Sequence, residues 1–461
     1  MAILFESIYT PGIAQISYIV GDAKAGIAAV IDPRRDVEPY LKLAAEKGVR
    51  IAYAIETHIH ADFVSGVHEL AARTGASIVG GLSDDYGFDL RQVTTGDTLE
   101  LGTVTLRVLH TPGHTPEHLC FLVSDAQQGS EPFAVYTGDT LFNLDVGRPD
   151  LVGNGTERSL AALLYHSLFD TLVPLGDRVE IYPCHGAGSA CGKSIGDRRQ
   201  STIGNERVYN DALKTERSEQ AFVDWLLHDM PPPPPHYARL KKLNAQGAPL
   251  RGGVPMVAPL GPEAFETLAK DTAVIDVRSI LAFGGGHVPG ALNIALHDEF
   301  PIWAGSMIDA GKPVLLVGES TTQIQEAVQQ LYRIGIDDVA GYLADGMTAW
   351  QNAGKPLASV SEWSVDDLDR RRSAGDVVVL DVRTLIEFEK GHVPGAVNVP
   401  LLQLRDGGPD IDRGKTVAAF CGSGYRASIA AGLLRQRGFA HVANVPGSWM
   451  AWKAAGLPVE S

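Results

Sequence analysis

An internal repeat in the C-terminal part of the chain constrains its fold more than any other feature. Residues 273–294 have the sequence AVIDVRSILAFGGGHVPGALNI, and residues 378–399 have the sequence VVLDVRTLIEFEKGHVPGAVNV. An offset of 105 residues separates His287 from His392. Two tandem copies of about 100 residues are too few for a solenoid, but each copy is long enough to form a small domain.

Two breaks in the sequence divide the chain. At 461 residues it has the length of about three domains. Residues 231–235 are five consecutive prolines, which form an extended, semi-rigid spacer, and a second break lies near residues 354–362. The sequence therefore predicts a first domain over residues 1–240, a linker over 241–260, and further domains over 261–357 and 362–461.

Both parts of the chain have the pattern of α/β domains. In the last repeat, short apolar runs rich in β-branched residues precede Asp381 and Cys421, and they predict buried parallel strands. The segment after Cys421 has helical apolar spacing up to Gly438. Residues 1–240 alternate strand-like and helical stretches, which is typical of a layered domain. The predicted fold class is a multidomain α/β protein whose two repeats each contain a parallel sheet.

Composition excludes several classes of function. The chain has 39 Lys and Arg residues against 55 Asp and Glu residues, which gives a net charge of −16. This balance argues against nucleic acids and anionic membranes as partners, because both require a basic face. No apolar run approaches the roughly 18 residues of a membrane span, and the N-terminus lacks the basic segment of a signal peptide. Four cysteines are too few for a disulfide scaffold, so we expect a reducing, cytoplasmic location.

Histidines and aspartates follow the apolar runs of the first domain. Residues 56–66, ETHIHADFVSG, come after the strand-like run RIAYAI and carry His58, His60 and Asp62. Three later segments have the same arrangement and contain His114, Asp139 and His185. Because α/β folds place ligands at the carboxyl ends of strands, we expect these side chains to converge on one divalent ion. Two histidines and one carboxylate would leave positions open on a non-haem Fe(II) that binds O₂.

The order of these motifs resembles the metallo-β-lactamase fold over residues 10–240, which implies an αββα sandwich. The leading family motif is HxHxDH, whereas this chain has Phe63 in place of the last histidine. In dinuclear zinc hydrolases of this fold, Asp62 and residue 63 would hold the second metal. Phenylalanine cannot bind a metal, so only Asp62 and His185 remain, and the departure speaks against a dinuclear site.

The persulfide dioxygenase branch of the fold uses a single iron. Resemblance to this branch implies one Fe(II) in the domain, held by His58, His114 and Asp139. The groups that would orient these ligands or contact substrate are His60, Asp62 and His185. Residues 147–150, GRPD, resemble the GRTD segment of the branch, which places Arg148 near the site. Its guanidinium could clamp a carboxylate of a thiol substrate such as glutathione, with a structural salt bridge as the alternative.

The cysteines of the first domain are judged by their surroundings. Cys191 lies six residues after His185, in the glycine-containing segment HGAGSACGKS. It is a candidate auxiliary thiol that accepts or relays sulfur, although a free cysteine often simply packs as a small buried residue. Cys120 and Cys184 lie within or directly after apolar runs, so we expect both in the core.

The last repeat contains a cysteine loop, FCGSGYRAS, over residues 420–428. A strand ends before Cys421 and a helix begins near Arg426, so backbone N–H groups of the loop can point at the sulfur. This geometry lowers a thiol pKa and stabilises a thiolate or persulfide, and Arg426 adds positive charge for an anionic substrate. An inert buried cysteine at a strand end is the alternative. The loop residues expected to bind substrate are Gly422, Ser423, Gly424 and Tyr425.

These motifs resemble the rhodanese sulfurtransferases over essentially all of residues 362–461, and Asp381 and Arg383 match an early family motif. The resemblance implies sulfur transfer with Cys421 and Arg426 as catalytic residues. The other repeat has Gly318 where Cys421 stands, and it lacks the arginine. We therefore expect an inactive copy that serves as a spacer or docking surface.

The combined resemblance is to a persulfide dioxygenase fused to an inactive and an active rhodanese domain. It implies oxidation of a glutathione- or coenzyme A-type persulfide with O₂ to sulfite. It also implies transfer of sulfane sulfur by Cys421 between persulfide and sulfite or thiosulfate, in either direction, and assembly into homo-oligomers. Two alternatives remain. One is a dinuclear zinc hydrolase of glutathione thioesters, similar to glyoxalase II, with a fused sulfurtransferase; the other is a sulfur carrier or sensor with a vestigial metal domain.

Overall fold

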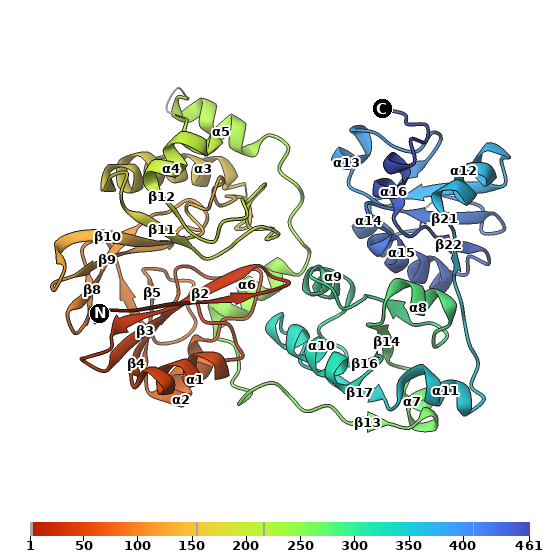
Figure 1. The fold of residues 1–461 in the computed structure, drawn as a ribbon, viewed down its shortest axis with the longest axis horizontal. Coiled ribbons are helices and arrows are strands. Elements are labelled where there is room, and N and C mark those ends of the chain that lie inside the picture. Colours follow the sequence, from red (N-terminus) through yellow and green to blue (C-terminus); the bar gives the residue numbers. More distant parts are fainter. Residues whose placement is uncertain (1–2, 154, 215–216, 409) are drawn as a thin grey trace. The chain divides into compact units, whose positions relative to one another are not determined.

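The chain divides into two units in the computed structural model, which describes residues 3–153, 155–214, 217–408 and 410–461 (Figure 1). The first unit holds Met1–Val254 with Tyr332–Gly335, and the second holds Pro255–Leu331 with Ile336–Ser461. The first unit thus continues beyond residue 240, where the sequence predicts the first domain to end. The reason is helix α6 (Tyr237–Gln246), which buries Tyr237 and Leu240 and so belongs to the packed domain.

The first unit contains two six-stranded sheets. The first sheet has the order β1 (Ile3–Thr10), β2 (Gln15–Asp22), β3 (Ile27–Ile31), β4 (Arg50–Ile55), β5 (Ser77–Gly81) and β6 (Arg91–Val93). Its first three strands pair antiparallel, and the strands from β3 to β6 pair parallel. Buried side chains such as Tyr40 of α1 (Glu38–Lys47) and Leu70 of α2 (Val67–Thr74) pack against its outer face.

The second sheet has the order β12 (Ser201–Thr202), β11 (Glu180–Pro183), β10 (Gly129–Gly138), β9 (Leu119–Asp125), β8 (Val104–His110) and β7 (Thr98–Leu101). Only β10 and β11 pair parallel, and the other neighbours pair antiparallel. The helical segments of this half are α3 (Glu157–His166), a π-helix (Ser167–Leu172), 3₁₀ turns (Val173–Leu175 and Asp211–Leu213), α4 (Ile203–Tyr209) and α5 (Glu219–Leu227).

The two sheets pack face to face because their strands alternate apolar side chains between two faces. In β10, Ala134 and Tyr136 join the core between the sheets, whereas Val135 joins the cluster beneath helices α3 and α5. This period of two is the signature of a strand that is buried on both faces. Helix, sheet, sheet and helix layers therefore follow one another, and the predicted αββα sandwich is confirmed.

Each repeat in the second unit contains a five-stranded parallel sheet. The sheet of the first repeat has the order β13 (Pro259–Leu260), β17 (Val339–Leu343), β16 (Val314–Val317), β14 (Ala273–Asp276) and β15 (Leu292–Asn293). The sheet of the second repeat has the order β18 (Ser361–Glu362), β22 (Val442–Asn444), β21 (Thr416–Phe420), β19 (Val377–Asp381) and β20 (Val397–Asn398). The helices are α7 (Pro262–Leu268), α8 (Ile280–Gly285), α9 (Phe300–Met307), α10 (Thr321–Arg333) and α11 (Gly346–Asn352), then α12 (Val365–Ser373), α13 (Leu385–Glu389), α14 (Leu401–Asp406), α15 (Tyr425–Gln436) and α16 (Ser448–Ala454). No helix within the described ranges is long and apolar enough to cross a membrane.

The two repeats are copies in detail as well as in strand order. The first central strand of each ends in a buried aspartate, Asp276 in β14 and Asp381 in β19. An arginine two residues later pairs with this carboxylate, Arg278 at 2.6 Å and Arg383 at 2.6 Å. The prediction of two tandem α/β domains with parallel sheets is confirmed.

Candidate functional site

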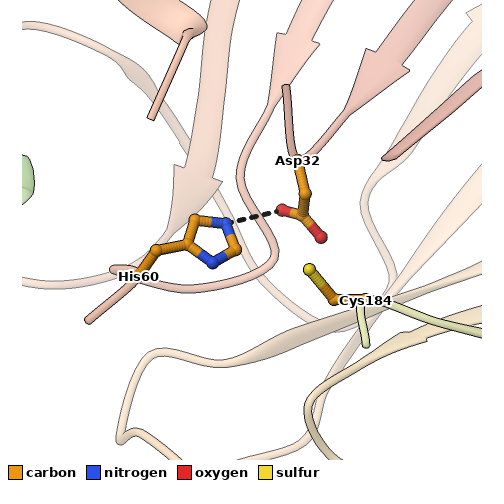
Figure 2. Close-up of side chains that lie close together, drawn as sticks. All are labelled: Asp32, His60 and Cys184. Atoms are coloured by element: carbon orange, nitrogen blue, oxygen red, sulfur yellow. Dashed lines mark hydrogen bonds and ion pairs between the residues drawn. The ribbon is translucent and has the colours of Figure 1, made fainter. Parts of the chain in front are cut away.

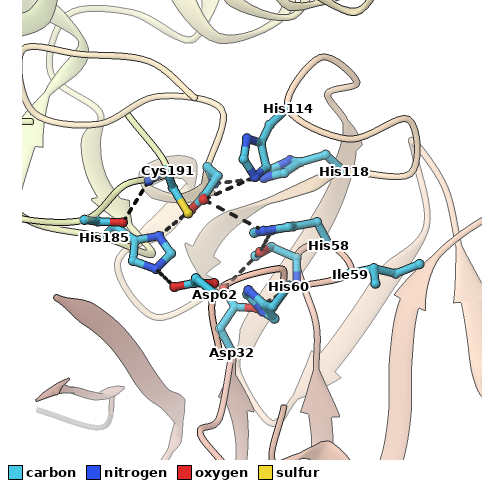
Figure 3. A network of polar contacts seen from close by, with 12 residues as sticks. Asp32, His58, Ile59, His60, Asp62, His114, His118, His185 and Cys191 are labelled. Atoms are coloured by element: carbon cyan, nitrogen blue, oxygen red, sulfur yellow. Dashed lines mark hydrogen bonds and ion pairs between the residues drawn. The ribbon is translucent and has the colours of Figure 1, made fainter. Parts of the chain in front are cut away.

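Four loops of the first unit carry the predicted metal site, and each follows a strand. His58 comes after β4, His114 after β8, Asp139 after β10 and His185 after β11. The side chains of His58, His114 and His185 point toward one another in Figure 3. All four side chains are at most 1% exposed. The strands of both sheets thus end at a common edge, where these loops bring the side chains together.

His58, His114 and Asp139 form a group that fits a divalent cation. One possible ligand atom from each lies within 4.8 Å of the other two. Asp139 Oδ2 lies 3.4 Å from His114 Nε2 and 3.8 Å from His58 Nε2. Among the described residues this oxygen has no hydrogen-bond partner, although it is fully buried. An unsatisfied buried carboxylate oxygen is costly, and a cation between the three groups would satisfy it.

In both His58 and His114, a hydrogen bond at Nδ1 fixes the orientation of the ring. His114 Nδ1 donates to the backbone carbonyl of Arg148 at 2.8 Å, and His58 Nδ1 lies 2.9 Å from the hydroxyl of Thr57. The Thr57 hydroxyl in turn donates to Asp32 at 3.0 Å, so it accepts from His58. Burial lowers the pKa of both imidazoles, which keeps them neutral. The Nε2 lone pairs are therefore free to bind a metal.

His60 does not join this group but contacts Asp32, as Figure 2 shows. Its Nε2 lies 3.0 Å from Asp32 Oδ1. Burial opposes the charged imidazolium, but the Asp32 carboxylate outweighs burial and raises the pKa of His60 above its usual value. Cys184 lies beside this pair and is buried, as expected for a core cysteine. His60 thus supports the loop that carries His58.

His185 is held between two carboxylates. Its Nε2 lies 2.8 Å from Asp62 Oδ2, and its Nδ1 lies 2.9 Å from Asp139 Oδ1 (Figure 3). Burial opposes protonation, but the two carboxylates outweigh it and raise the pKa of His185. The Asp139 carboxylate therefore joins the two sides of the site, with Oδ1 on His185 and Oδ2 toward His58 and His114.

Cys191 lies beside Asp62 and His185. The three offer ligand atoms within 4.8 Å of one another, and Cys191 is 1% exposed. Burial raises the pKa of its thiol. Phe63, where the family motif has histidine, is fully buried with its ring centroid 4.4 Å from that of His60. Cys191 thus joins Asp62 and His185, the two residues that remain for a second metal, whereas Phe63 packs on His60.

Arg148 is fully engaged by the protein itself. Its Nε and Nη2 bind Asp150 at 2.6 and 2.7 Å, and the guanidinium also donates to the carbonyls of Ala190 and Pro231. This is the salt bridge that the sequence left as the alternative. The contact of Arg148 with a substrate carboxylate stays a prediction.

Two residues that the motif analysis passed over support the site. His118 Nε2 accepts a hydrogen bond from the Asp139 N–H at 2.9 Å, and burial lowers its pKa to about 3. Asn244, on helix α6, donates to the carbonyls of His60 at 2.8 Å and Phe63 at 2.7 Å. His118 was visible in the HTPGHTPEH segment, but nothing in the local sequence marks Asn244.

One backbone N–H of the Cys421 loop points at the sulfur. The N–H of Gly424 donates to Cys421 Sγ at 3.1 Å, and α15 begins directly after this glycine. Gly424 has φ of +100°, and a Cβ there would lie 2.9 Å from Pro446 Cα, so the turn requires glycine. The sulfur therefore lies at the N-terminus of a twelve-residue helix.

Arg426 is paired with a carboxylate from α13. Its Nη2 and Nη1 bind Glu387 at 2.7 and 2.8 Å. Burial alone would raise the pKa of Glu387, but Arg426 outweighs it and lowers the pKa to about 2. The positive charge of Arg426 is thus compensated within the repeat, and its catalytic role stays a prediction.

The other repeat lacks the thiol at the corresponding position. Gly318 follows β16 as Cys421 follows β21. A Cβ at Gly318 would lie 2.8 Å from Ile324 Cδ1. A cysteine there would require only a shift of this flexible side chain, so the packing alone does not exclude one.

Comparisons with known proteins match both parts of the chain. The model of the Metallo-beta-lactamase superfamily matches residues 10–185, and the model of the Rhodanese-like domain matches residues 262–353 and 364–455. The solved structure of a metallo-beta-lactamase from Staphylococcus aureus subsp. aureus COL is 37% identical with a TM-score of 0.68, and the match covers 74% of this chain and 99% of that one.

Two kinds of curated relative have similar identity. The mitochondrial persulfide dioxygenase of Homo sapiens is 31% identical over 214 residues, which cover 46% of this chain and 76% of that protein. A hydroxyacylglutathione hydrolase of a Polaromonas species is 30% identical over 264 residues, which cover 50% of this chain and 94% of that protein. The sequence identities to the dioxygenase and to the hydrolase are almost equal, so they do not distinguish the two activities. The residues of the site must be used to distinguish them.

Proposed function

Because the chain belongs to the metallo-β-lactamase superfamily and carries two rhodanese-like domains behind that domain, we propose that it is a bifunctional enzyme of sulfur metabolism. The first domain oxidises a glutathione-type persulfide with O₂ to sulfite. The last domain transfers sulfane sulfur through Cys421 between persulfide and sulfite or thiosulfate. A cytoplasmic location and self-association accompany this proposal as predictions.

The arrangement around Asp139 supports the first activity. Two neutral histidines and one carboxylate oxygen without a partner converge in a buried site, and Phe63 occupies the position of a second-metal ligand. Two histidines and a carboxylate suit a single Fe(II) with open positions, which would supply O₂ binding and electron transfer. His58, His114 and Asp139 would hold the ion, while Asp62 and Asp139 hold a proton on His185 beside it.

The second activity rests on the Cys421 loop. The Cys421 sulfur attacks the outer sulfur of a persulfide, and the thiolate of the carrier leaves. The Gly424 N–H and the start of α15 stabilise charge on the sulfur. Sulfite then takes the sulfane sulfur and departs as thiosulfate. The product of the first domain is thus the acceptor for the last.

One observation favours a second candidate, a dinuclear zinc hydrolase of glutathione thioesters. Asp62, His185 and Cys191 form a further group of three ligands despite Phe63. Aspartate, histidine and thiolate are all ligands that zinc accepts. This candidate also agrees with the similarity to hydroxyacylglutathione hydrolases.

Metal content and oxygen uptake distinguish the two candidates. The purified chain should contain about one iron, and it should consume O₂ with glutathione persulfide while sulfite appears. His114→Ala should lose iron and O₂ uptake but keep transfer of sulfur from thiosulfate to cyanide, which Cys421→Ser should abolish. Two zinc ions per chain with hydrolysis of a glutathione thioester and no O₂ uptake would establish the hydrolase instead.

A further inference from the structure

Each repeat of the second unit contains a short antiparallel bridge near its end. In the second repeat, which carries Cys421, His392 and Glu460 exchange two backbone hydrogen bonds at 2.8 and 2.9 Å. In the first repeat, His287 and Ala358 do the same at 2.9 and 3.0 Å. His287 precedes His392 by 105 residues, and Ala358 precedes Glu460 by 102. Ala358 therefore stands where the second repeat has a carboxylate.

In the second repeat, two groups hold the Glu460 carboxylate. Its Oε2 accepts a hydrogen bond from the Gly395 N–H at 2.9 Å and lies 3.8 Å from His392 Nε2. The other ring nitrogen of His392, Nδ1, donates to the carbonyl of Phe388 at 3.0 Å. A glycine N–H and an imidazole nitrogen thus form a cradle for one carboxylate oxygen.

The first repeat has the same cradle without the carboxylate. His287 Nδ1 donates to the carbonyl of Phe283 at 2.8 Å, as in the other copy. Gly290 corresponds to Gly395, at the same offset as the two histidines. Among the described residues, neither His287 Nε2 nor the Gly290 N–H has a hydrogen-bond partner, although His287 is only 3% exposed. Buried polar groups normally have partners, so this pair indicates a place for a ligand.

A cavity of about 550 Å³ lies against this cradle and is lined by His287, Gly290 and Ala358. Arg435, in the last turn of α15, lines it from the second repeat. The Arg435 guanidinium donates to backbone carbonyls and has no carboxylate partner within the described part of the chain. Apolar wall comes from residues that include Pro289 and Phe439. Both the volume and the mixture of apolar walls with a few polar groups are typical of a small-molecule site.

We propose that this cavity binds a small organic carboxylate in the place that the Glu460 carboxylate has in the second repeat. The Gly290 N–H and His287 would hold the anion, and Arg435 would supply positive charge. Because His287 Nδ1 is bound to a carbonyl, Nε2 is the atom that faces the anion, and it can take up a proton as the anion binds. The apolar walls suit a short hydrocarbon body. The site is separate from the metal ligands and from Cys421, so it does not depend on the proposed function.

Butyrate and butyramide test the site in the full wild-type chain, because they share a shape and only butyrate is charged. We expect butyrate to bind about ten-fold more tightly, since hydrogen bonds to a charged acceptor are stronger than those to a neutral one. Saturation-transfer NMR at equal ionic strength measures both dissociation constants. Equal binding of the two compounds, or no binding of butyrate, would overturn the inference.

Substitutions at the bridge locate the binding. Ala358→Glu supplies the carboxylate that the second repeat has, so it should block butyrate binding and raise the melting temperature by a few degrees. Ala358→Gln fills the same space without charge, so it should block butyrate but leave the melting temperature near that of wild type. Butyrate binding that survives in both variants would overturn the inference.

Ser359→Glu is the matched control. It adds the same charge one residue later, at an exposed position whose side chain points to the other side of an extended chain. This variant should bind butyrate like wild type, and loss of binding would show that any added carboxylate repels the probe. All three variants should keep Cys421-dependent sulfur transfer. If wild type itself lacks that transfer, the proposed transferase function fails while the carboxylate site still stands or falls on butyrate binding.

Discussion

The sequence predicts the positions of the charged side chains near the two sites, but it does not predict what each of them contacts. His58, His114 and Asp139 converge because each follows a strand that ends at the same edge. Arg148 and Arg426 carry charge that the motifs suggest for substrate, yet both guanidiniums bind carboxylates of the chain. The sequence reveals a charge but not its partner, and Glu387 lies 39 residues from Arg426.

Asn244 is the residue whose removal should most clearly affect the metal site from a distance. Asn244→Ala leaves the carbonyls of His60 and Phe63 without their donor inside a buried loop. We expect a loss of about 2 kcal/mol in the free energy of unfolding and weaker metal retention. Urea denaturation and metal analysis after dialysis measure the two effects. Asn352→Ala, at an exposed position of α11, is the control and should change neither quantity.

At the scale of elements, the two repeats share one arrangement of strands but differ in the residue that follows the central strand. Both have the same strand order and the same pair of aspartate and arginine after the first central strand. They differ at the next central strand, where β21 leads to Cys421 and β16 leads to Gly318. The strand and helix pattern was predictable from the repeat. The approach of the Ile324 side chain to Gly318 was not.

The short strand β18 makes the stability of the second unit depend on pH. Burial raises the pKa of Glu362 to about 7, against the opposing effect of its hydrogen bond with Asn444. A raised carboxyl pKa means that the folded state favours the protonated form. Its contribution to stability is complete below about pH 4.5 and is lost as the pH rises through about 7.

Glu362→Gln should therefore stabilise the chain at pH 8 by about 1 kcal/mol, a value reduced for the partial solvent exposure of the side chain. At pH 5 the substitution should have little effect, because the native carboxyl is already protonated. Thermal unfolding at the two pH values checks this. An equal shift of the melting temperature at pH 5 and pH 8 would contradict a titrating Glu362.

For the whole molecule, the two candidate sites lie in different units. The candidate metal ligands His58, His114 and Asp139 lie in the first unit, and the Cys421 loop lies in the second. In the proposed function, the fusion makes chemical sense because sulfite from the first reaction would be the acceptor in the second. A shared small product requires only diffusion between the sites.

Thiosulfate formation from glutathione persulfide and O₂ should therefore need both centres but not one chain. His114→Ala and Cys421→Ser should each fail to make thiosulfate from persulfide alone. A mixture of the two variants should restore it, because free sulfite passes from one protein to the other. Chromatography of sulfite and thiosulfate follows the reaction. A mixture that accumulates sulfite without thiosulfate would show that transfer requires both centres in one chain.

The αββα fold of the first domain was implied by the family resemblance. The sequence by itself determined the domain order, the parallel sheets of the two repeats, the copy without a nucleophile and the loops that carry the candidate ligands. These follow from local patterns, because apolar periodicity sets the strands and a motif directly after a strand lies at its end. Only the tertiary structure decided what each polar group touches. Cys191 meets Asp62, and Asn244 reaches back from α6 to the carbonyls of His60 and Phe63. Such contacts join residues far apart in the chain, and no local pattern encodes them.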